Sequence, residues 1–194
     1  GYQAPVTELD ARTGEVLRTY AGTERTGEIL YQEGKLILSV LTDPTPSPGV
    51  RVMAVDAATG ERLWISEKAY RGSTVDYIRW KEMHGGIEPP PLDPSLNTAT
   101  DGRVVALIDG PEVVGLDART GRETWRSPFP LDQADLNAGG MQTQGNLWIG
   151  TMIVAGGVVL HASPHRLAAL SAESGEVLWS RPKRYIGHLW YEWK

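Results

Sequence analysis

The hexapeptide Leu-Asp-Ala-Arg-Thr-Gly occurs twice in this chain, at Leu9–Gly14 and again at Leu116–Gly121. A relaxed form of the pattern occurs four times, and each copy places a large side chain four residues after the glycine. The copies are Glu8–Arg18, Ala54–Trp64, Gly115–Trp125 and Ala169–Trp179. Recurrence of one short unit along a chain of 194 residues indicates a repeat architecture.

Each copy predicts a β-hairpin. An apolar strand leads into Asp-Ala-x-Thr-Gly, where the Asp side chain accepts bonds from nearby backbone N–H groups and glycine takes the positive φ that other residues resist. A second strand then leaves the turn. The four turn glycines are Gly14, Gly60, Gly121 and Gly175.

Further strands are predicted upstream of the later hairpins, at Gly34–Val40, Gly102–Ile108 and Gly157–His161. Two strands followed by a hairpin, in a unit of about 40–50 residues, is the order expected of a propeller blade. We therefore expect one all-β domain over residues 1–194. Its hairpins are expected at residues 6–20, 52–66, 113–127 and 167–181, and its insertions at 71–100 and 128–145.

The pattern Ala-x-Asp-x-x-x-Gly-x-x-x-Trp resembles the tryptophan-docking repeat of quinoprotein-like β-propellers. That family includes the pyrroloquinoline-quinone (PQQ) alcohol dehydrogenases and a non-enzymatic propeller lipoprotein of outer-membrane assembly, and we place the chain closer to the second kind. The match is complete at Ala54–Trp64 and departs at Gly115, at Ser171 and at Arg18, which holds the Trp position of the first copy. The resemblance extends over residues 6–179. It implies about four blades of four antiparallel strands, a partial β-propeller from a seven- or eight-bladed ring.

The resemblance also implies a structural role for the repeated tryptophans. Each docking Trp packs flat against the hairpin of the neighbouring blade, because an indole buries a large apolar area and its N–H reaches a backbone carbonyl. Carried over to this chain, Trp64, Trp125 and Trp179 hold blade to blade. Arg18, at the corresponding position, is expected to mark a blade whose neighbour is absent or altered.

Four repeats make only about half of such a ring. A half-ring would expose apolar blade faces and strand edges, which favour aggregation. We therefore expect the missing half to come from another chain, from a second copy of this chain, or from a longer parent polypeptide. The segment Tyr185–Trp193 is expected to open a further blade.

The composition of the chain excludes several classes of partner and site. The formal net charge of −5 provides no basic surface for nucleic acid. The chain has no Cys, which excludes disulfides, thiolate metal sites and a cysteine nucleophile within it. Its longest apolar stretches, such as Met152–Leu160, are too short to span a bilayer. The resemblance implies a periplasmic or cell-envelope location in bacteria.

The first insertion contains Val75–Met83, which could form a short amphipathic helix carrying Trp80, followed by the proline run Pro89–Pro91. Long loops on a rigid scaffold often bind partners, although a decorative loop is the simpler interpretation. The second insertion gathers Gln144 and Asn146 beside Trp148, a composition seen on sugar- or peptide-binding surfaces. It also fits an ordinary loop leading into a strand at Asn146–Thr151, and we favour that interpretation.

No catalytic residue is predicted. His161 and His165 have a spacing that would suit a metal on a helix, but Pro164 and the preceding strand argue against a helix. A quinone enzyme of the resembling family would need a stacking Trp and several calcium ligands, and the visible Asp residues lie in repeat turns. We therefore expect no metal and no cofactor, with PQQ and calcium as the alternative.

Three functions are compatible with these observations. We prefer a non-catalytic propeller scaffold that presents loops to a protein partner, as a segment of a larger envelope protein. The alternatives are a quinoprotein dehydrogenase-like or enzyme-associated propeller domain, and a carbohydrate-binding propeller that uses the Trp148 region. A propeller fold alone does not decide among them.

Overall fold

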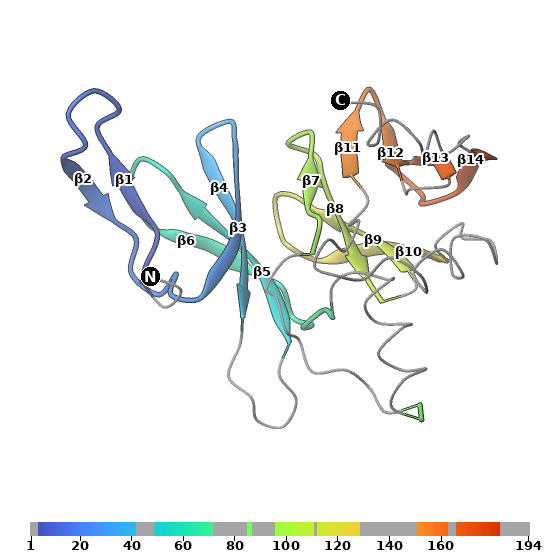
Figure 1. The fold of residues 1–194 in the computed structure, drawn as a ribbon, viewed down its shortest axis with the longest axis horizontal. Coiled ribbons are helices and arrows are strands. Elements are labelled where there is room, and N and C mark those ends of the chain that lie inside the picture. Colours follow the sequence, from blue (N-terminus) through green and yellow to red (C-terminus); the bar gives the residue numbers. More distant parts are fainter. Residues whose placement is uncertain are drawn as a thin grey trace, which may run out of the picture.

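The computed structural model describes residues 4–41, 49–71, 85–86, 96–110, 112–128, 151–162 and 166–182, and every regular element in them is a β-strand (Figure 1). The strands form four antiparallel sheets in chain order. This confirms the predicted all-β fold class, a partial propeller. The four sheets are called the first to fourth blades below.

The first blade has two strands and the other three have four each. The first blade contains β1 (Thr7–Leu9) and β2 (Val16–Thr19). The second contains β3 (Thr26–Gln32), β4 (Lys35–Leu41), β5 (Val50–Asp56) and β6 (Arg62–Ile65). The third contains β7 (Ala99–Thr100), β8 (Val104–Asp109), β9 (Glu112–Asp117) and β10 (Glu123–Pro128). The fourth contains β11 (Thr151–Ala155), β12 (Val158–Ala162), β13 (Arg166–Ser171) and β14 (Val177–Pro182).

The repeated motif forms the turn between the last two strands of each blade. In the third blade, the Asp117 carboxylate accepts hydrogen bonds from the backbone N–H groups of Arg119 (2.9 Å) and Thr120 (2.8 Å). The N–H of Gly121 returns to the carbonyl of Asp117 at 2.8 Å, and Gly121 has φ +71°. A side chain at this glycine would be strained, because only glycine adopts such a φ readily.

A β-bulge follows the turn in every blade. In the third blade, Glu123 pairs with Leu116 but Trp125 pairs with Gly115, so one extra residue is inserted before the tryptophan. The same register shift precedes Arg18, Trp64 and Trp179. A bulge re-aims the side chains that follow it. Here it turns Trp64 and Trp125 toward the next blade.

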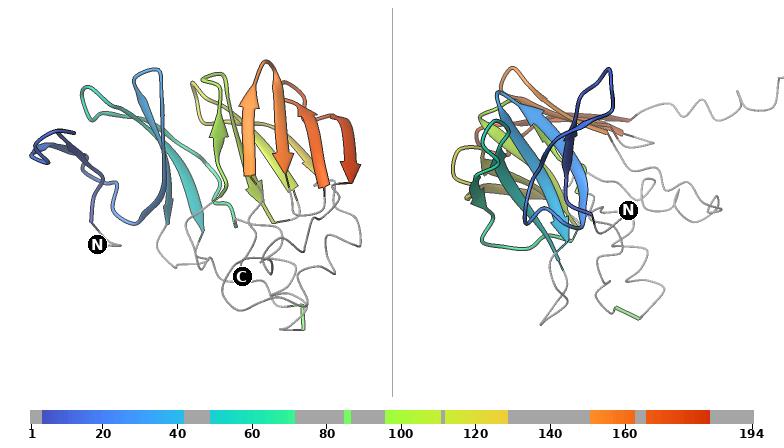
Figure 2. Two further views of the ribbon diagram at one scale, coloured as in Figure 1. Left: turned by 45° about the horizontal axis from the view of Figure 1, so that its top comes forward. Right: turned by 90° about the vertical axis from the view of Figure 1, so that its left-hand side faces the viewer.

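The core lies between blades rather than between layers of one sandwich. One cluster joins the second and third blades, with Val52 and Trp64 packed beside Leu107 and Leu116. A second cluster joins the third and fourth blades around Trp125, and a third joins the first and second blades around Tyr20. The first strands β3, β7 and β11 contact one another in turn, so the blades fan around a common side (Figure 2).

The neighbour of the first blade differs from the expectation drawn from Arg18. That neighbour is a complete four-stranded blade, not an absent or altered one. The Arg18 guanidinium donates to the carbonyl of Ala57 at 3.0 Å and also to that of Ala58, both in the turn of the second blade. The buried Tyr20 hydroxyl donates to the same Ala57 carbonyl at 2.9 Å. Two side chains thus occupy the place of one indole.

Candidate functional site

The blades have two unlike ends. The Asp-Ala-x-Thr-Gly turns lie at one end, here called the turn end (Figure 2). The two long connections, from β6 to β7 and from β10 to β11, leave and return at the opposite end, here called the loop end. Since the turns are short and uniform, the loop end is where this scaffold differs from blade to blade.

The start of the first long connection is fastened to the second blade. Tyr70 is buried and pairs with Val50, through N–H to carbonyl bonds of 2.7 and 2.9 Å. Burial raises the pKa of the Tyr70 hydroxyl, which therefore stays neutral. One residue later, the backbone N–H of Arg71 donates to the Asp109 carboxylate of the third blade at 2.9 Å.

The end of the same connection is fastened by Glu28 on β3. The Glu28 carboxylate accepts hydrogen bonds from the N–H of Leu96 (2.8 Å) and from the hydroxyls of Thr98 (2.7 Å) and Ser39 (2.9 Å). Ser39 and Thr98 are also 3.0 Å apart, so the contact bridges the second and third blades. Bonds to an ionised acceptor are among the stronger ones in proteins. Both ends of the insertion are therefore held in place.

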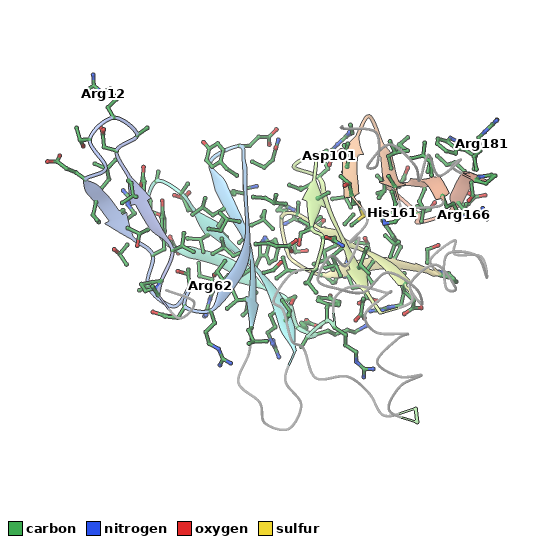
Figure 3. The ribbon with its side chains drawn as sticks, in the orientation of Figure 1. Arg12, Arg62, Asp101, His161, Arg166 and Arg181 are labelled. Carbon is green, nitrogen blue, oxygen red and sulfur yellow. The ribbon has the colours of Figure 1, made fainter. Side chains whose placement is uncertain are left out.

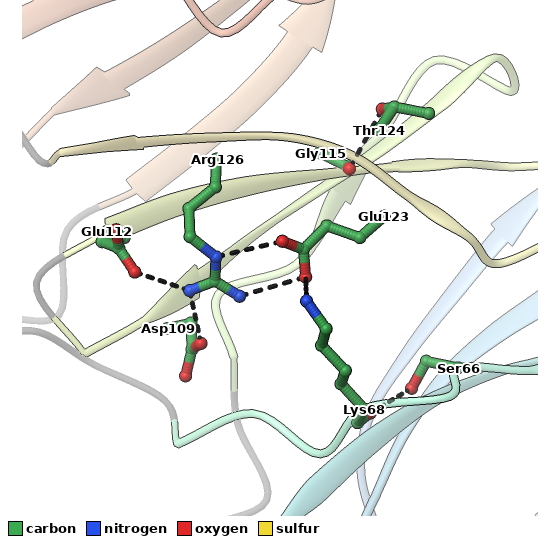
Figure 4. A network of polar contacts seen from close by, with 8 residues as sticks. All are labelled: Ser66, Lys68, Asp109, Glu112, Gly115, Glu123, Thr124 and Arg126. Atoms are coloured by element: carbon green, nitrogen blue, oxygen red, sulfur yellow. Dashed lines mark hydrogen bonds and ion pairs between the residues drawn. The ribbon is translucent and has the colours of Figure 1, made fainter.

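A charged cluster lies beside the point where the insertion departs (Figure 4). The Arg126 guanidinium contacts Asp109 at 2.7 Å, Glu112 at 2.6 Å and both oxygens of Glu123 at 3.0 Å. Lys68 reaches Glu123 from the second blade at 3.2 Å. The hydrogen bonds from Arg126, aided by Lys68 and opposed by partial burial, hold the pKa of Glu123 below its ordinary value. The cluster ties two blades together at the base of the loop.

A small cavity opens next to this cluster, between the outermost strands of the second and third blades. Its volume is about 170 Å³, and it is lined by Glu67, Lys68, Tyr70, Gly121, Arg122 and Glu123. Sites for drug-sized ligands are larger, from about 300 Å³ upward. This cavity therefore suits a water molecule or a small ion better than a flat tricyclic cofactor.

The residues described here do not fit a calcium–quinone centre. The repeat carboxylates Asp10, Asp56 and Asp117 accept backbone N–H bonds within their own turns. Three other carboxylates converge near Arg126, but the guanidinium stands between them. Within the described ranges, no group of three His, Cys, Asp or Glu side chains is arranged to hold a metal. The carboxylates of Asp10, Asp56 and Asp117 thus already serve their turns, and those around Arg126 already serve ion pairs.

The structure places some of the predicted site residues and leaves others outside its described part. The indole N–H of Trp64 donates to the carbonyl of Ala118 at 3.0 Å, and that of Trp125 to the carbonyl of Ala172 at 2.8 Å. Trp179 lies on the outer face of the fourth blade and is 40% exposed. The candidate ligand residues Trp80, Gln144, Asn146 and Trp148 lie outside the described residues, as do the segments Val75–Met83 and Tyr185–Trp193.

The histidine pair is placed only in part. His161 lies on β12 and is buried (Figure 3), in a strand rather than a helix, whereas His165 falls outside the described residues. Arg12 lies at the tip of the first turn, at the turn end of the molecule (Figure 3).

Sequence reasoning missed the roles of Glu28, Tyr20 and Arg126. Their contacts join positions that are far apart in the chain, and no local sequence pattern predicts such contacts. One signal was available: an alanine follows the Asp or Ser in all four turns. Its carbonyl accepts a hydrogen bond from the preceding blade at Ala57, Ala118 and Ala172.

Fold and site together define a class of protein. It is a repeat β-propeller whose blades are joined by side chains that reach the turn of the next blade, and whose first long connection is anchored at the loop end. Within the described ranges, no helix has the length and apolar character to cross a bilayer.

The chain belongs to the family described as outer membrane protein assembly factor BamB, whose model matches residues 49–187. Among solved structures it is similar to BamB from Moraxella catarrhalis, with a TM-score of 0.55 and 16% identity over 92% of this chain and 47% of that one. It is also similar to a quinohemoprotein alcohol dehydrogenase from Pseudomonas putida, with a TM-score of 0.56 and 17% identity over 95% of this chain and 32% of that one. No curated protein matches the chain.

This chain therefore spans about half the length of the first of these relatives and a third of the second. At identities this low, the two likenesses show the fold and leave activity open.

Proposed function

We propose that this chain is a non-catalytic β-propeller scaffold that presents its loop end to a protein partner in the bacterial envelope. The observation that carries the proposal is the anchoring of the first insertion at both of its ends. Arg71 is held by Asp109, and Leu96 and Thr98 are held by Glu28. A loop whose ends are fixed loses less conformational freedom on binding, which favours recognition.

The chemistry of the repeats supports a scaffold. Asp56 and Asp117 serve their own turns, and Trp64 and Trp125 each reach the turn of the next blade. We infer that Trp64, Trp125 and Trp179, with Gly14, Gly60, Gly121 and Gly175, are structural docking residues. The described repeats then supply rigidity, and binding is left to the connections.

Site-specific photo-crosslinking would test the role of the loop end. A photoreactive residue at Arg71 or Pro128, both exposed at the loop end, is expected to trap an envelope protein in intact cells. The same group at Arg12 or Arg119, both exposed at the turn end, is the matched control and is expected to trap none. Equal trapping at both ends, or trapping at the turn end alone, would refute the proposal.

A loop replacement would separate binding from folding. Residues 72–95 are replaced by a flexible Gly-Ser linker, while Arg71 and Leu96 and their anchors stay. The unfolding midpoint is expected to change little, and the crosslink from Arg71 is expected to disappear. A variant that keeps the crosslink would show that the insertion does not bind the partner.

The quinone alternative has its own readout. The family likeness includes a quinohemoprotein alcohol dehydrogenase, so a bound quinone is a chemical hypothesis worth measuring. Addition of PQQ with calcium, followed by dialysis and an absorbance spectrum, is expected to leave no stoichiometric quinone on the chain. Retained quinone that calcium chelation removes would favour the dehydrogenase-like alternative over the scaffold.

The envelope location is part of the proposal, and the family description, which refers to outer-membrane assembly, supports it. Fractionation of cells that produce the protein is expected to recover it with the periplasm or the membranes. Recovery in the cytoplasmic fraction alone would contradict this part of the proposal.

A further inference from the structure

The cavity between the outermost strands of the second and third blades has a polar lining. Its volume is about 170 Å³, and its lining combines two cations, two carboxylates, a tyrosine and a glycine. These residues are Glu67, Lys68, Tyr70, Gly121, Arg122 and Glu123. What such a space can hold depends on which of the polar groups around it still lack hydrogen-bond partners.

Tyr70 provides the first spare donor. The residue is 1% exposed, and its backbone is fixed by the pair of hydrogen bonds with Val50. Within the described ranges, no hydrogen-bond partner is found for its hydroxyl. Burial raises the pKa of this hydroxyl, and the nearby charges of Glu123 and Arg126 act on it in opposite directions, so it lies close to the wall that Glu123 forms. A ligand that accepts its hydrogen bond would remove the cost of leaving it unpaired.

Two cations provide the other spare donors. The Lys68 ammonium donates one hydrogen bond to Glu123 at 3.2 Å and has further N–H groups to donate. The exposed Arg122 guanidinium makes no ion pair and no side-chain hydrogen bond with the residues that the structure describes. Arg126 differs from both, because three carboxylates already surround it.

The acceptors of the lining are largely used. Glu123 accepts hydrogen bonds from Arg126 on both of its oxygens and from Lys68 on one of them (Figure 4). Glu67 is exposed, and it makes no ion pair with the described part of the chain. A ligand that accepts hydrogen bonds therefore complements this cavity better than one that donates them.

We propose that the cavity binds a carboxylate of the protein partner, supplied by an Asp or Glu side chain. The carboxylate oxygens accept hydrogen bonds from the Tyr70 hydroxyl, the Lys68 ammonium and the Arg122 guanidinium. A single negative charge suits the lining better than the double charge of a phosphate, because Glu67 and Glu123 repel an anion. Since the cavity lies beside the base of the first insertion, the site rests on the function proposed above and adds the chemistry of the partner.

Titration with acetate tests the site without the partner. The amide chemical shifts of Gly121, Arg122 and Glu123 are followed by NMR while sodium acetate replaces sodium chloride at constant ionic strength. Acetate is expected to cause saturable shifts confined to the cavity lining. Methylammonium, a cation of similar size, is expected to cause none. Absence of saturation with acetate, or equal binding of methylammonium, would overturn the proposal.

Substitutions in the lining make the titration specific. Tyr70→Phe removes only the hydroxyl and Arg122→Gln removes a charge, and each should weaken acetate binding about 2–10-fold. Glu67→Gln removes a repelling charge and should tighten the binding about 2–5-fold. Arg119→Gln is the matched control, because Arg119 is exposed in the adjoining turn and does not line the cavity. Unchanged acetate binding in both Tyr70→Phe and Arg122→Gln would overturn the proposal.

Crosslinking in cells separates the carboxylate site from the scaffold function. Tyr70→Phe and Arg122→Gln should each lower the trapping of the partner by the photoreactive residue at Arg71, and Arg119→Gln should not. Trapping without any acetate binding would overturn the carboxylate site and leave the scaffold function standing. Acetate binding without trapping would support the site and contradict the scaffold function. Acetate binding with trapping that neither substitution lowers would overturn the assignment of the carboxylate to the partner.

Discussion

The indole of Trp64 lies directly over Gly121 of the next blade. A Cβ built on Gly121 would stand 2.7 Å from Cδ2 of that ring, closer than packed carbon atoms approach. Trp125 and Gly175 repeat the relationship one blade later, at 2.8 Å. The turn glycine is thus required twice, once for its backbone conformation and once for the space above it.

Replacing glycine in two turns would separate these requirements. Gly121 and Gly14 have nearly the same φ, +71° and +74°, but only Gly121 lies under a ring. Both Gly→Ala variants should lose about 1–2 kcal/mol of unfolding free energy to the left-handed backbone. Gly121→Ala should lose about 1–3 kcal/mol more through overpacking. Urea unfolding at low chain concentration measures the difference. Equal losses would mean that the Trp64 ring moves away from the added methyl group at no cost in free energy.

Truncating the tryptophans should rank them by burial. Trp64→Ala removes a buried indole and should lower the free energy of unfolding by about 3–5 kcal/mol. Trp64→Phe keeps an aromatic ring but leaves the Ala118 carbonyl without its donor, and should cost about 1–3 kcal/mol. Trp179→Ala in the single chain should cost about 0.5 kcal/mol, as exposed substitutions usually do. A loss for Trp179→Ala as large as that for Trp64→Ala, in urea unfolding, would contradict the ranking.

Arg18 and Tyr20 should behave as a coupled pair. Both donate to the carbonyl of Ala57, so either one alone keeps that acceptor bonded. Arg18→Met and Tyr20→Phe should each cost about 1 kcal/mol. The double variant should cost more than the sum, because the carbonyl then loses both donors. A double-mutant cycle by urea unfolding measures the coupling, and strict additivity would show that the two bonds are independent.

Acid should weaken three of the four turns. Backbone bonds from Thr13 and Thr59 are the leading causes that hold the pKa of Asp10 and of Asp56 below 3.8. Burial opposes the shift at Asp117, but bonds from Thr120 and Arg119 still lower its pKa. A lowered folded-state pKa stabilises the fold above about pH 4, and this stabilisation is lost as the pH falls through the folded-state values.

The fourth turn provides the control for the acid effect. Ser171 stands where the other turns have Asp, and its hydroxyl accepts the N–H of Ser174 at 3.3 Å. Asp117→Asn should flatten the fall in stability below about pH 4, and Ser171→Asp should steepen it. Thermal unfolding at a series of pH values gives both curves. Curves that are parallel for all three proteins would place the acid sensitivity elsewhere.

Removing Arg126 should cost far more than removing a more exposed arginine. Arg126→Met leaves Asp109, Glu112 and Glu123 facing one another without the guanidinium, with only Lys68 still in contact with Glu123, and should destabilise the fold by about 1–3 kcal/mol. Arg103→Met also breaks an ion pair, with Asp101, but that arginine is mostly exposed and the loss should be below about 1 kcal/mol. Added salt should reduce the difference by screening the carboxylates. Equal losses of unfolding free energy in urea would mean that the Arg126 cluster stabilises the fold no more than the Arg103–Asp101 pair does.

The local parts of the fold could be predicted because their causes are local. The turn at Asp117–Gly121 follows from an Asp that bonds two and three residues ahead and a glycine with positive φ, and both are visible in the sequence. Strands such as β4 and β12 follow from short apolar runs bounded by glycine. Repetition of these local units then indicates the propeller.

The site was less predictable because its contacts span blades. Glu28 and Leu96 are far apart in the chain, and a lone Glu in a strand gives no sign of which backbone it will bond. Arg18 was misread for a similar reason. Tyr20, two residues after Arg18, also donates to the turn of the neighbouring blade, where the other blades use one indole. The contact depends on how the two blades pack, so the sequence around Arg18 does not indicate it.

The one-way contact from tryptophan to turn also constrains how such chains lengthen over evolutionary time. A tandem duplication of one unit inserts a blade that can reach the unit after it and be reached by the unit before it, so no existing junction needs redesign. A blade that loses its tryptophan without a substitute such as Arg18 with Tyr20 would break the series at that point. Growth by whole units is therefore the least disruptive route to propellers of different size.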